Sequence, residues 1–230
     1  MKKIIFSIAF SFFVVTGFTQ QISKITLATN GDLESIAVAV DDNVIVNLTD
    51  KVTISKFGLE PYNLRTENYG DYTDRLDPYN GRIEYYTPND NPAFSGKVKY
   101  IGKTQITYYA SYDDEILKGK IKSIGTNFIS YYQAFEDTML RGRIAKIGGA
   151  ALGYFTSFDN PALRGKLRSV GITNLNYYTS YDDKAFSGRI KSIGNVSFTY
   201  YSSFDRPEYR GGRKTGQQLQ YINGIKFYTK

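Results

Sequence analysis

The sequence predicts an all-β protein built as an elongated tandem array of antiparallel β-hairpin repeats. Glycine recurs at a fixed period of 23 residues, which is typical of stacked repeats. Each period holds two short runs with strand-type alternation, and no segment sustains a helical period. The turns between the two runs are short, which favours hairpins, because parallel strands need long crossover connections. The alternative is a β-solenoid, in which each run pairs in parallel with its copy one repeat later.

The repeat unit is defined by two glycines and an aromatic pair. Run A extends from the first glycine to the second, and run B follows it and ends in the aromatic pair. The first glycine lies at Gly96, Gly119, Gly142, Gly165, Gly188 and Gly211, and the second at Gly102, Gly125, Gly148, Gly171 and Gly194. The aromatic pairs are Tyr85-Tyr86, Tyr108-Tyr109, Tyr131-Tyr132, Tyr154-Phe155, Tyr177-Tyr178 and Tyr200-Tyr201.

Residues 1–20 have the pattern of a secretory signal peptide. Lys2 and Lys3 precede an apolar run, Ile4–Phe18, and small or polar residues follow it. The run is short for a membrane span, so an N-terminal membrane anchor is the less favoured alternative. We therefore expect an exported mature chain without a transmembrane span, located in the periplasm, at the cell surface or outside the cell.

Residues 21–58 are predicted to form N-terminal β-hairpins and the start of the first repeat. Ile22–Thr29 alternates as a strand, and Ser35–Val40 and Val44–Leu48 read as a hairpin. Val52–Gly58 ends like run A and is interpreted as the first half of an interrupted repeat.

Three further segments complete the chain. Residues 59–80 are predicted to be an inserted loop, residues 81–211 the β repeats, and residues 212–230 C-terminal capping strands, because a stack must cap its ends. Insertions in repeat proteins often lie on the working face, so a specific function is expected at 59–80 rather than within the regular repeats. The alternative is a surface loop without a role.

Side chains alternate across a strand, so each run has an inward and an outward set. In run B, we expect Ile106, Tyr108, Ala110 and Tyr112 to point into the core, and in the last repeat Phe204 as well. In run A, the inward positions are Val98, Ile121, Ile144, Leu167 and Ile190.

Cations occupy the opposite positions of run A, and stacking is expected to align them as a basic ladder. Its members are Lys97, Lys99, Lys120, Lys122, Arg143, Lys166, Arg168, Arg189 and Lys191. One interpretation is a solvated strand face whose charge keeps the surface soluble and blocks unwanted edge pairing. The other is a surface that binds anions.

A half-exposed aromatic ladder and an acidic row accompany the cations. The tyrosines of the ladder are Tyr109, Tyr132, Tyr178 and Tyr201, which either stack across strands or offer their faces to sugars. The acidic row consists of Asp90, Asp113, Glu136, Asp159, Asp182 and Asp205. We interpret these acids as turn caps, because one or two carboxylates per repeat are too few for a calcium ladder.

Composition narrows the function classes. The net charge of +7 is uneven: residues 21–95 sum to −6 and residues 96–211 to +7. The chain has no cysteine and no histidine, so it lacks a thiol nucleophile and the commonest general base and metal ligand. We expect no metal site and no cofactor.

These observations favour a non-catalytic scaffold or binding protein of the cell envelope. Its partner is expected to be an anionic polymer, a glycan, an envelope surface or an unknown protein, contacted through the basic strand face. Nucleic acid is not expected as a partner of an exported chain. A secreted carbohydrate-active enzyme is the alternative.

The unit Phe186-Ser187-Gly188-Arg189-Ile190, followed by a short turn and an aromatic strand ending at Phe204-Asp205, resembles a MORN-type repeat. The resemblance covers about 81–211 and implies consecutive β-hairpins in an elongated single sheet. Isoleucine or leucine stands at the MORN tryptophan position and the Gly-x-Gly is missing, so no function is carried over. The chain also resembles exported Tyr/Gly tandem-repeat proteins of Gram-negative bacteria, which implies export and no particular chemistry.

Overall fold

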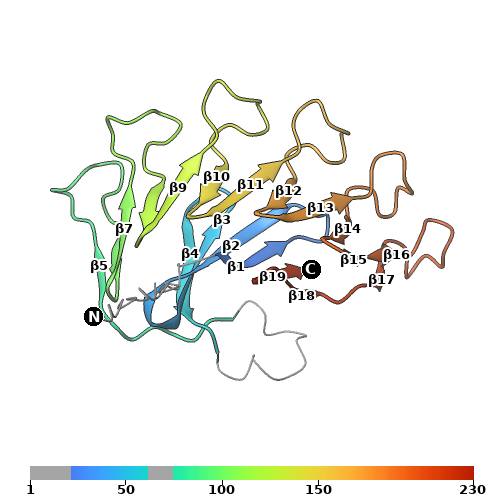
Figure 1. The fold of residues 1–230 in the computed structure, drawn as a ribbon, viewed down its shortest axis with the longest axis horizontal. Coiled ribbons are helices and arrows are strands. Elements are labelled where there is room, and N and C mark those ends of the chain that lie inside the picture. The colour runs from blue at the N-terminus through green and yellow to red at the C-terminus, as the bar shows by residue number, and fades with distance from the viewer. Residues whose placement is uncertain (1–21, 62–74) are drawn as a thin grey trace, which may run out of the picture.

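The computed structural model describes residues 22–61 and 75–230, which form strands, turns and loops with one 3₁₀ turn at Asp41–Asn43. The strands make two large sheets that face each other and a two-stranded sheet at one end (Figure 1). The predicted all-β class is confirmed. The predicted signal peptide, residues 1–20, and most of the inserted loop, residues 59–80, lie outside the described residues.

The repeats form an open sheet of eleven strands that follow one another in chain order. The strands are β5 (Ile83–Tyr85), β6 (Val98–Ile101), β7 (Thr104–Tyr108), β8 (Ile121–Ile124), β9 (Asn127–Tyr131), β10 (Ile144–Ile147), β11 (Ala150–Tyr154), β12 (Leu167–Val170), β13 (Thr173–Tyr177), β14 (Ile190–Ile193) and β15 (Val196–Ser197). All neighbours are antiparallel: Ile121 pairs with Tyr108 and Ile124 pairs with Asn127. This register confirms the hairpin array and excludes the solenoid, in which Ile121 would lie beside Ile144.

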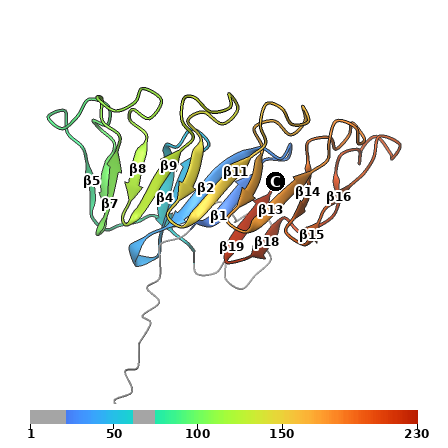
Figure 2. The same cartoon turned by 45° about the horizontal axis from the view of Figure 1, so that its top comes forward.

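Two kinds of connection join the strands. At one edge, a two-residue turn such as Gly125-Thr126 links run A to run B, and the φ of +57° at Gly125 suits the first position of a type II′ turn. At the other edge, longer loops lead from run B to the next run A (Figure 2). Each of these loops ends at a glycine with positive φ, for example +73° at Gly119.

The second sheet has six strands in the order β18-β19-β1-β2-β3-β4. Its strands are β1 (Ile22–Leu27), β2 (Leu33–Ala39), β3 (Val44–Thr49), β4 (Ile54–Leu59), β18 (Leu219–Ile222) and β19 (Ile225–Thr229). The predicted hairpins of the N-terminal segment are present as β1, β2 and β3. The first and last of the described strands are neighbours in this sheet, because β1 pairs in parallel with β19.

Two segments differ from the prediction. Val52–Gly58 does not begin the repeat array, because Val46, Asn47 and other residues of β3 pair with β4. Residues 212–230 do not simply cap the stack. Only β17 (Arg213–Thr215) stays with the last repeat, where it pairs with β16 (Thr199–Tyr200), and the β18–β19 hairpin turns back to β1.

The core lies between the two sheets. The predicted inward residues of run A are buried at Ile121, Ile144, Leu167 and Ile190, and they join one apolar cluster with Ile25 and other residues of the second sheet. Polar contacts also cross between the layers: the Thr104 hydroxyl donates to Asp41 (3.0 Å) and the Asn223 amide donates to Thr173 (2.9 Å). The repeat sheet is therefore one layer of a two-layer structure, since its apolar face needs a partner.

We predict that Gly119→Ala destabilises the fold more than Gly96→Ala. Both glycines have a φ near +75°, so each alanine costs about 1 kcal/mol of left-handed strain. A Cβ at Gly119 would also lie 2.7 Å from the Ala93 carbonyl oxygen, whereas a Cβ at Gly96 meets nothing within 4 Å. In urea unfolding, the free energy of unfolding of Gly119→Ala should be lower than that of Gly96→Ala by at least about 1 kcal/mol. Equal losses of stability in the two variants would show that the close approach of neighbouring repeats does not affect the cost of the substitution.

Candidate functional site

The structure separates the predicted basic ladder into two rows. The inner row follows the first glycine of each unit directly and contains Lys97, Lys120, Arg143, Lys166 and Arg189. The outer row lies two residues later and contains Lys99, Lys122, Arg168 and Lys191, with Lys214 as a further member that the sequence analysis did not include. The two rows have different contacts, so they are considered separately.

The inner row is engaged in holding the repeats together. Lys97 and Lys120 each donate to the glycine carbonyl of the next repeat at 2.5 Å, and Arg143 does so at 2.6 Å. The cations also lie over the inward tyrosines, with Arg189 5.4 Å from the centre of the Tyr200 ring. Burial lowers the pKa of the Lys97 and Lys120 ammonium groups. These side chains therefore act within the fold rather than on a ligand.

Lys166 makes a different contact that joins the two sheets. Its Nζ donates to the carbonyl oxygen of Asn30 (2.7 Å) and to the carboxylate of Asp32 (2.6 Å), and the side chain is only 8% exposed. Asn30 and Asp32 belong to the turn between β1 and β2. This turn packs closely on the repeats, since a Cβ at Gly31 would lie 2.6 Å from the Gly188 carbonyl oxygen.

The outer row remains at the surface. Lys122, Arg168, Lys191 and Lys214 are exposed, and each cation lies 5.3–5.7 Å from the centre of an aromatic ring. Among the described residues, only Lys99 of this row has a carboxylate within 4 Å, that of Asp90 at 3.9 Å. The third repeat breaks the row, because alanine occupies the equivalent position, Ala145.

The predicted tyrosine ladder is half-buried, and the hydroxyls of Tyr132 and Tyr178 are hydrogen-bonded. The Tyr132 hydroxyl donates to the Leu152 carbonyl (2.9 Å), and that of Tyr178 donates to the Phe198 carbonyl (3.0 Å). The first three rings pack edge-to-face on the inward tyrosine of the next repeat at 5.9–6.0 Å, whereas Tyr201 packs on Tyr209. Burial raises the pKa of the Tyr109, Tyr132 and Tyr178 hydroxyls. These contacts favour the stacking interpretation over sugar binding at these rings.

A third aromatic position was wrongly predicted to be part of the core. Ile106, Tyr108 and Ala110 are buried as expected, but the aromatic residue that follows them is 85–95% exposed in five consecutive loops. We call this set the aromatic edge: Tyr112, Phe135, Phe158, Tyr181 and Phe204. The alternation fails because run B leaves the sheet at the aromatic pair and turns.

The predicted turn caps explain why the chain turns there. Asp159 accepts hydrogen bonds from the backbone N–H (2.6 Å) and the hydroxyl (2.8 Å) of Thr156, and Asp182 does the same with Thr179. These bonds lower the pKa of both carboxyl groups. An acid three residues after a serine or threonine therefore marks a turn in the sequence. This signal would have predicted that the strand ends before Phe158.

A second set of polar residues ties each loop to the next. Asp137 accepts from the backbone N–H of Ser157 (3.1 Å), and Asp183 accepts from that of Ser203 (2.9 Å). Asn160 makes the equivalent bond at the junction between them. The loops therefore have a fixed spacing along the edge of the array.

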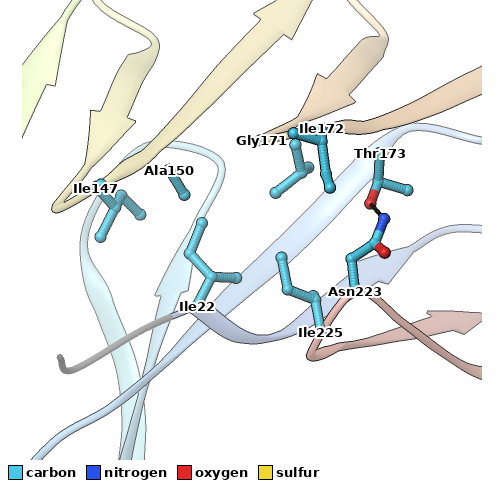
Figure 3. A pocket seen from close by; sticks show the side chains of 10 residues that line it. Ile22, Ile147, Ala150, Gly171, Ile172, Thr173, Asn223 and Ile225 are labelled. Carbon is cyan, nitrogen blue, oxygen red and sulfur yellow. Dashed lines mark hydrogen bonds between the residues drawn. The ribbon is translucent and has the colours of Figure 1, made fainter. Parts of the chain in front are cut away.

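A hollow with a volume of about 280 Å³ lies at the opposite edge (Figure 3). Aliphatic side chains line it, among them Ile22, Ile147 and Ile225, and its polar pair, Thr173 and Asn223, is already hydrogen-bonded. None of the described residues that line it is a carboxylate or a cation, so this lining offers no acid, base or charged anchor.

Comparisons with known protein families, with curated proteins and with solved structures each found no match. Within residues 22–61 and 75–230, no cluster of three potential metal ligands occurs. The same residues contain no helix long and apolar enough to cross a membrane. The function must therefore be inferred from the surface rows themselves.

We predict that Lys166→Met lowers the free energy of unfolding by about 2 kcal/mol, because the hydrogen bond from the charged Lys166 Nζ to the Asn30 carbonyl is lost. Little of the loss should come from the ion pair, since the Asp32 side chain is 58% exposed. Lys122→Met is the matched control and should change stability by less than about 0.5 kcal/mol. If urea unfolding gives the two variants equal stability, Lys166 does not join the sheets as described.

We predict a loss of stability at acid pH that depends on the loop carboxylates. The pKa of Asp137 is lowered, first by the Ser157 hydroxyl, and that of Asp183 is lowered, first by a backbone N–H. A lowered folded pKa stabilises the protein above the unfolded value of about 3.9, and this contribution disappears as the pH falls through the folded pKa.

The double variant Asp137→Asn/Asp183→Asn tests this origin. Asparagine already makes the same bond at Asn91 and Asn160, so the variant should fold normally. Its thermal midpoint should fall less steeply than that of the parent chain between about pH 5 and pH 2. Superimposable pH profiles would assign the acid sensitivity to other groups.

Proposed function

We propose that this chain is an exported, non-catalytic β-repeat scaffold that binds an acidic polymer of the cell envelope. The proposal rests first on the outer row, in which Lys122, Arg168 and Lys191 are exposed and lie on one face of a regular sheet. Export is inferred from the signal-peptide pattern of residues 1–20.

The spacing of the outer row suits a linear, repeating anion. Each repeat adds two strands to the sheet, so equivalent side chains advance by about 9.5 Å per repeat. A flexible acidic chain that follows the row would contact several cations at once, and each further contact becomes effectively intramolecular. The rings beneath the cations, such as Tyr109 and Tyr178, hold the charged groups in defined positions.

The alternative of a carbohydrate-active enzyme has weaker support. Such enzymes place two carboxyl groups across the scissile bond, and the acid usually has a raised pKa. The loop acids of this chain cap turns, and the pKa of Asp159, Asp182 and Asp205 is lowered instead. The geometry therefore favours binding without catalysis.

We predict that the triple variant Lys122→Glu/Arg168→Glu/Lys191→Glu loses affinity for an acidic polysaccharide. Polygalacturonate and an envelope fraction serve as probes for the mature chain, residues 21–230. Removing and reversing three charges should weaken binding roughly 30-fold or more at low salt. About 1 M salt should weaken binding by the parent chain as well, because the Debye length is then about 3 Å.

The control carries the same change of net charge away from the row. Lys103, Lys184 and Arg206 are exposed cations in turns and loops, and their joint replacement by glutamate should leave most of the binding intact. If the two triple variants lose affinity equally, the effect is one of net charge. If neither loses affinity, the outer row is only a solvated surface and the proposal fails.

A further inference from the structure

The aromatic edge presents five large rings to solvent, each in the same place of successive loops. The exposed fractions are 86% for Tyr112, 85% for Phe135, 92% for Phe158 and Tyr181, and 95% for Phe204. The loops that carry them line one edge of the array (Figure 2). Single exposed aromatics need no explanation, but an aromatic residue at the same exposed position of five successive loops does.

The aromatic character is retained although it contributes nothing visible to the fold. Three residues further along each loop, another exposed position carries no constant chemistry: its residues are Glu115, Thr138, Pro161, Lys184 and Pro207. Two exposed positions in the same loops thus differ, and only one is aromatic in all five. Packing within the chain does not account for this difference, which points to contact with a partner outside the chain.

The spacing between the rings is built into the loops. Asp137, two residues after Phe135, binds the backbone of Ser157, the residue before Phe158. The same link joins the later rings through Asn160 and Asp183. The two strands added per repeat set steps of about 9.5 Å between equivalent positions of the sheet, and these bonds hold each loop to the next. Equal steps along a line match a linear polymer better than a globular partner.

Charge distinguishes among the possible polymers and surfaces. A carboxylate follows every ring directly, and turn bonds lower the pKa of those at Asp159, Asp182 and Asp205, so they stay ionised. An anionic lipid surface or an acidic polymer would meet repulsion there. An uncharged partner meets no such repulsion, so the charge of the loops favours a neutral polymer.

We propose that the aromatic edge binds an uncharged, extended β-linked polysaccharide that runs along the array. The C–H face of a pyranose ring carries partial positive charge and packs on the negative face of an aromatic ring. An extended disaccharide is about as long as the step from one repeat to the next in the sheet. We therefore expect one exposed ring to stack on every second sugar. This site is separate from the outer row and does not depend on it.

The test compares the mature chain with the triple variant Phe135→Ala/Phe158→Ala/Tyr181→Ala. The probes are cellohexaose and the β-1,4-linked hexamer of N-acetylglucosamine, measured by calorimetry. We expect the parent chain to bind at least one hexamer far more tightly than its disaccharide, because several rings act together. The triple variant should lose roughly a hundredfold in affinity. Because the three positions are exposed, the variant should fold normally, and an unchanged thermal midpoint will verify this.

Two matched controls separate the edge from other surfaces. Phe128→Ala removes a ring that is 70% exposed but lies on β9, outside the aromatic edge, and should leave hexamer binding unchanged. The charge-reversal variant of the outer row should also keep it. If the charge-reversal variant loses hexamer binding, the outer row and the aromatic edge form one site, and the proposal that they are separate is wrong.

Other outcomes would overturn the inference. Failure of the parent chain to bind either hexamer would refute a neutral glycan, as would equal binding by the triple variant. Phosphatidylcholine vesicles and sedimentation velocity test a lipid surface and a second copy as occupants. Vesicle binding or self-association that disappears in the triple variant would assign the edge to that occupant instead.

Discussion

The inward apolar face of the repeat sheet is the constraint on which the rest of the fold depends. Eleven strands place Ile121, Ile144, Leu167 and their equivalents on one side, and a single-layer sheet leaves that side in water. The chain covers it with strands from both of its ends, which is why β1 and β19 meet in the second sheet. Lys166 fits this arrangement as the cation of the inner row that reaches the covering sheet instead of the next repeat.

The period of 23 residues made the repeat architecture predictable from sequence, because glycine turns and alternation are local properties. The antiparallel hairpins and the buried residues of run A followed directly from them. The role of the terminal segments was not predictable in the same way. Val52–Gly58 has a strand pattern that fits either sheet, and only its pairing with β3 decides. Long-range pairing of this kind leaves no local signal in the chain.

The surface was harder to predict than the core. Strict alternation assigns Tyr112 and Phe204 to the interior, but a carboxylate caps the turn before either ring can point inward. Alternation also gives Lys120 and Lys122 the same face, whereas a register shift within the strand pair puts one against the next repeat and leaves the other in solvent. In both cases, one local irregularity repeated in every unit changes the chemistry of a whole row.

Across the repeats, the same positions hold the fold together and the same other positions are exposed to a partner. Inner cations bind glycine carbonyls, inward tyrosines contact the core, and loop carboxylates satisfy backbone N–H groups. These groups are already bonded, so a partner would have to break a contact of the fold to use them. The outer row, which rests on aromatic rings, and the aromatic edge both remain exposed, and both recur once per repeat apart from Ala145 in the outer row. An array of this form suits a partner that is itself periodic, because each added repeat then contributes one further contact of the same kind.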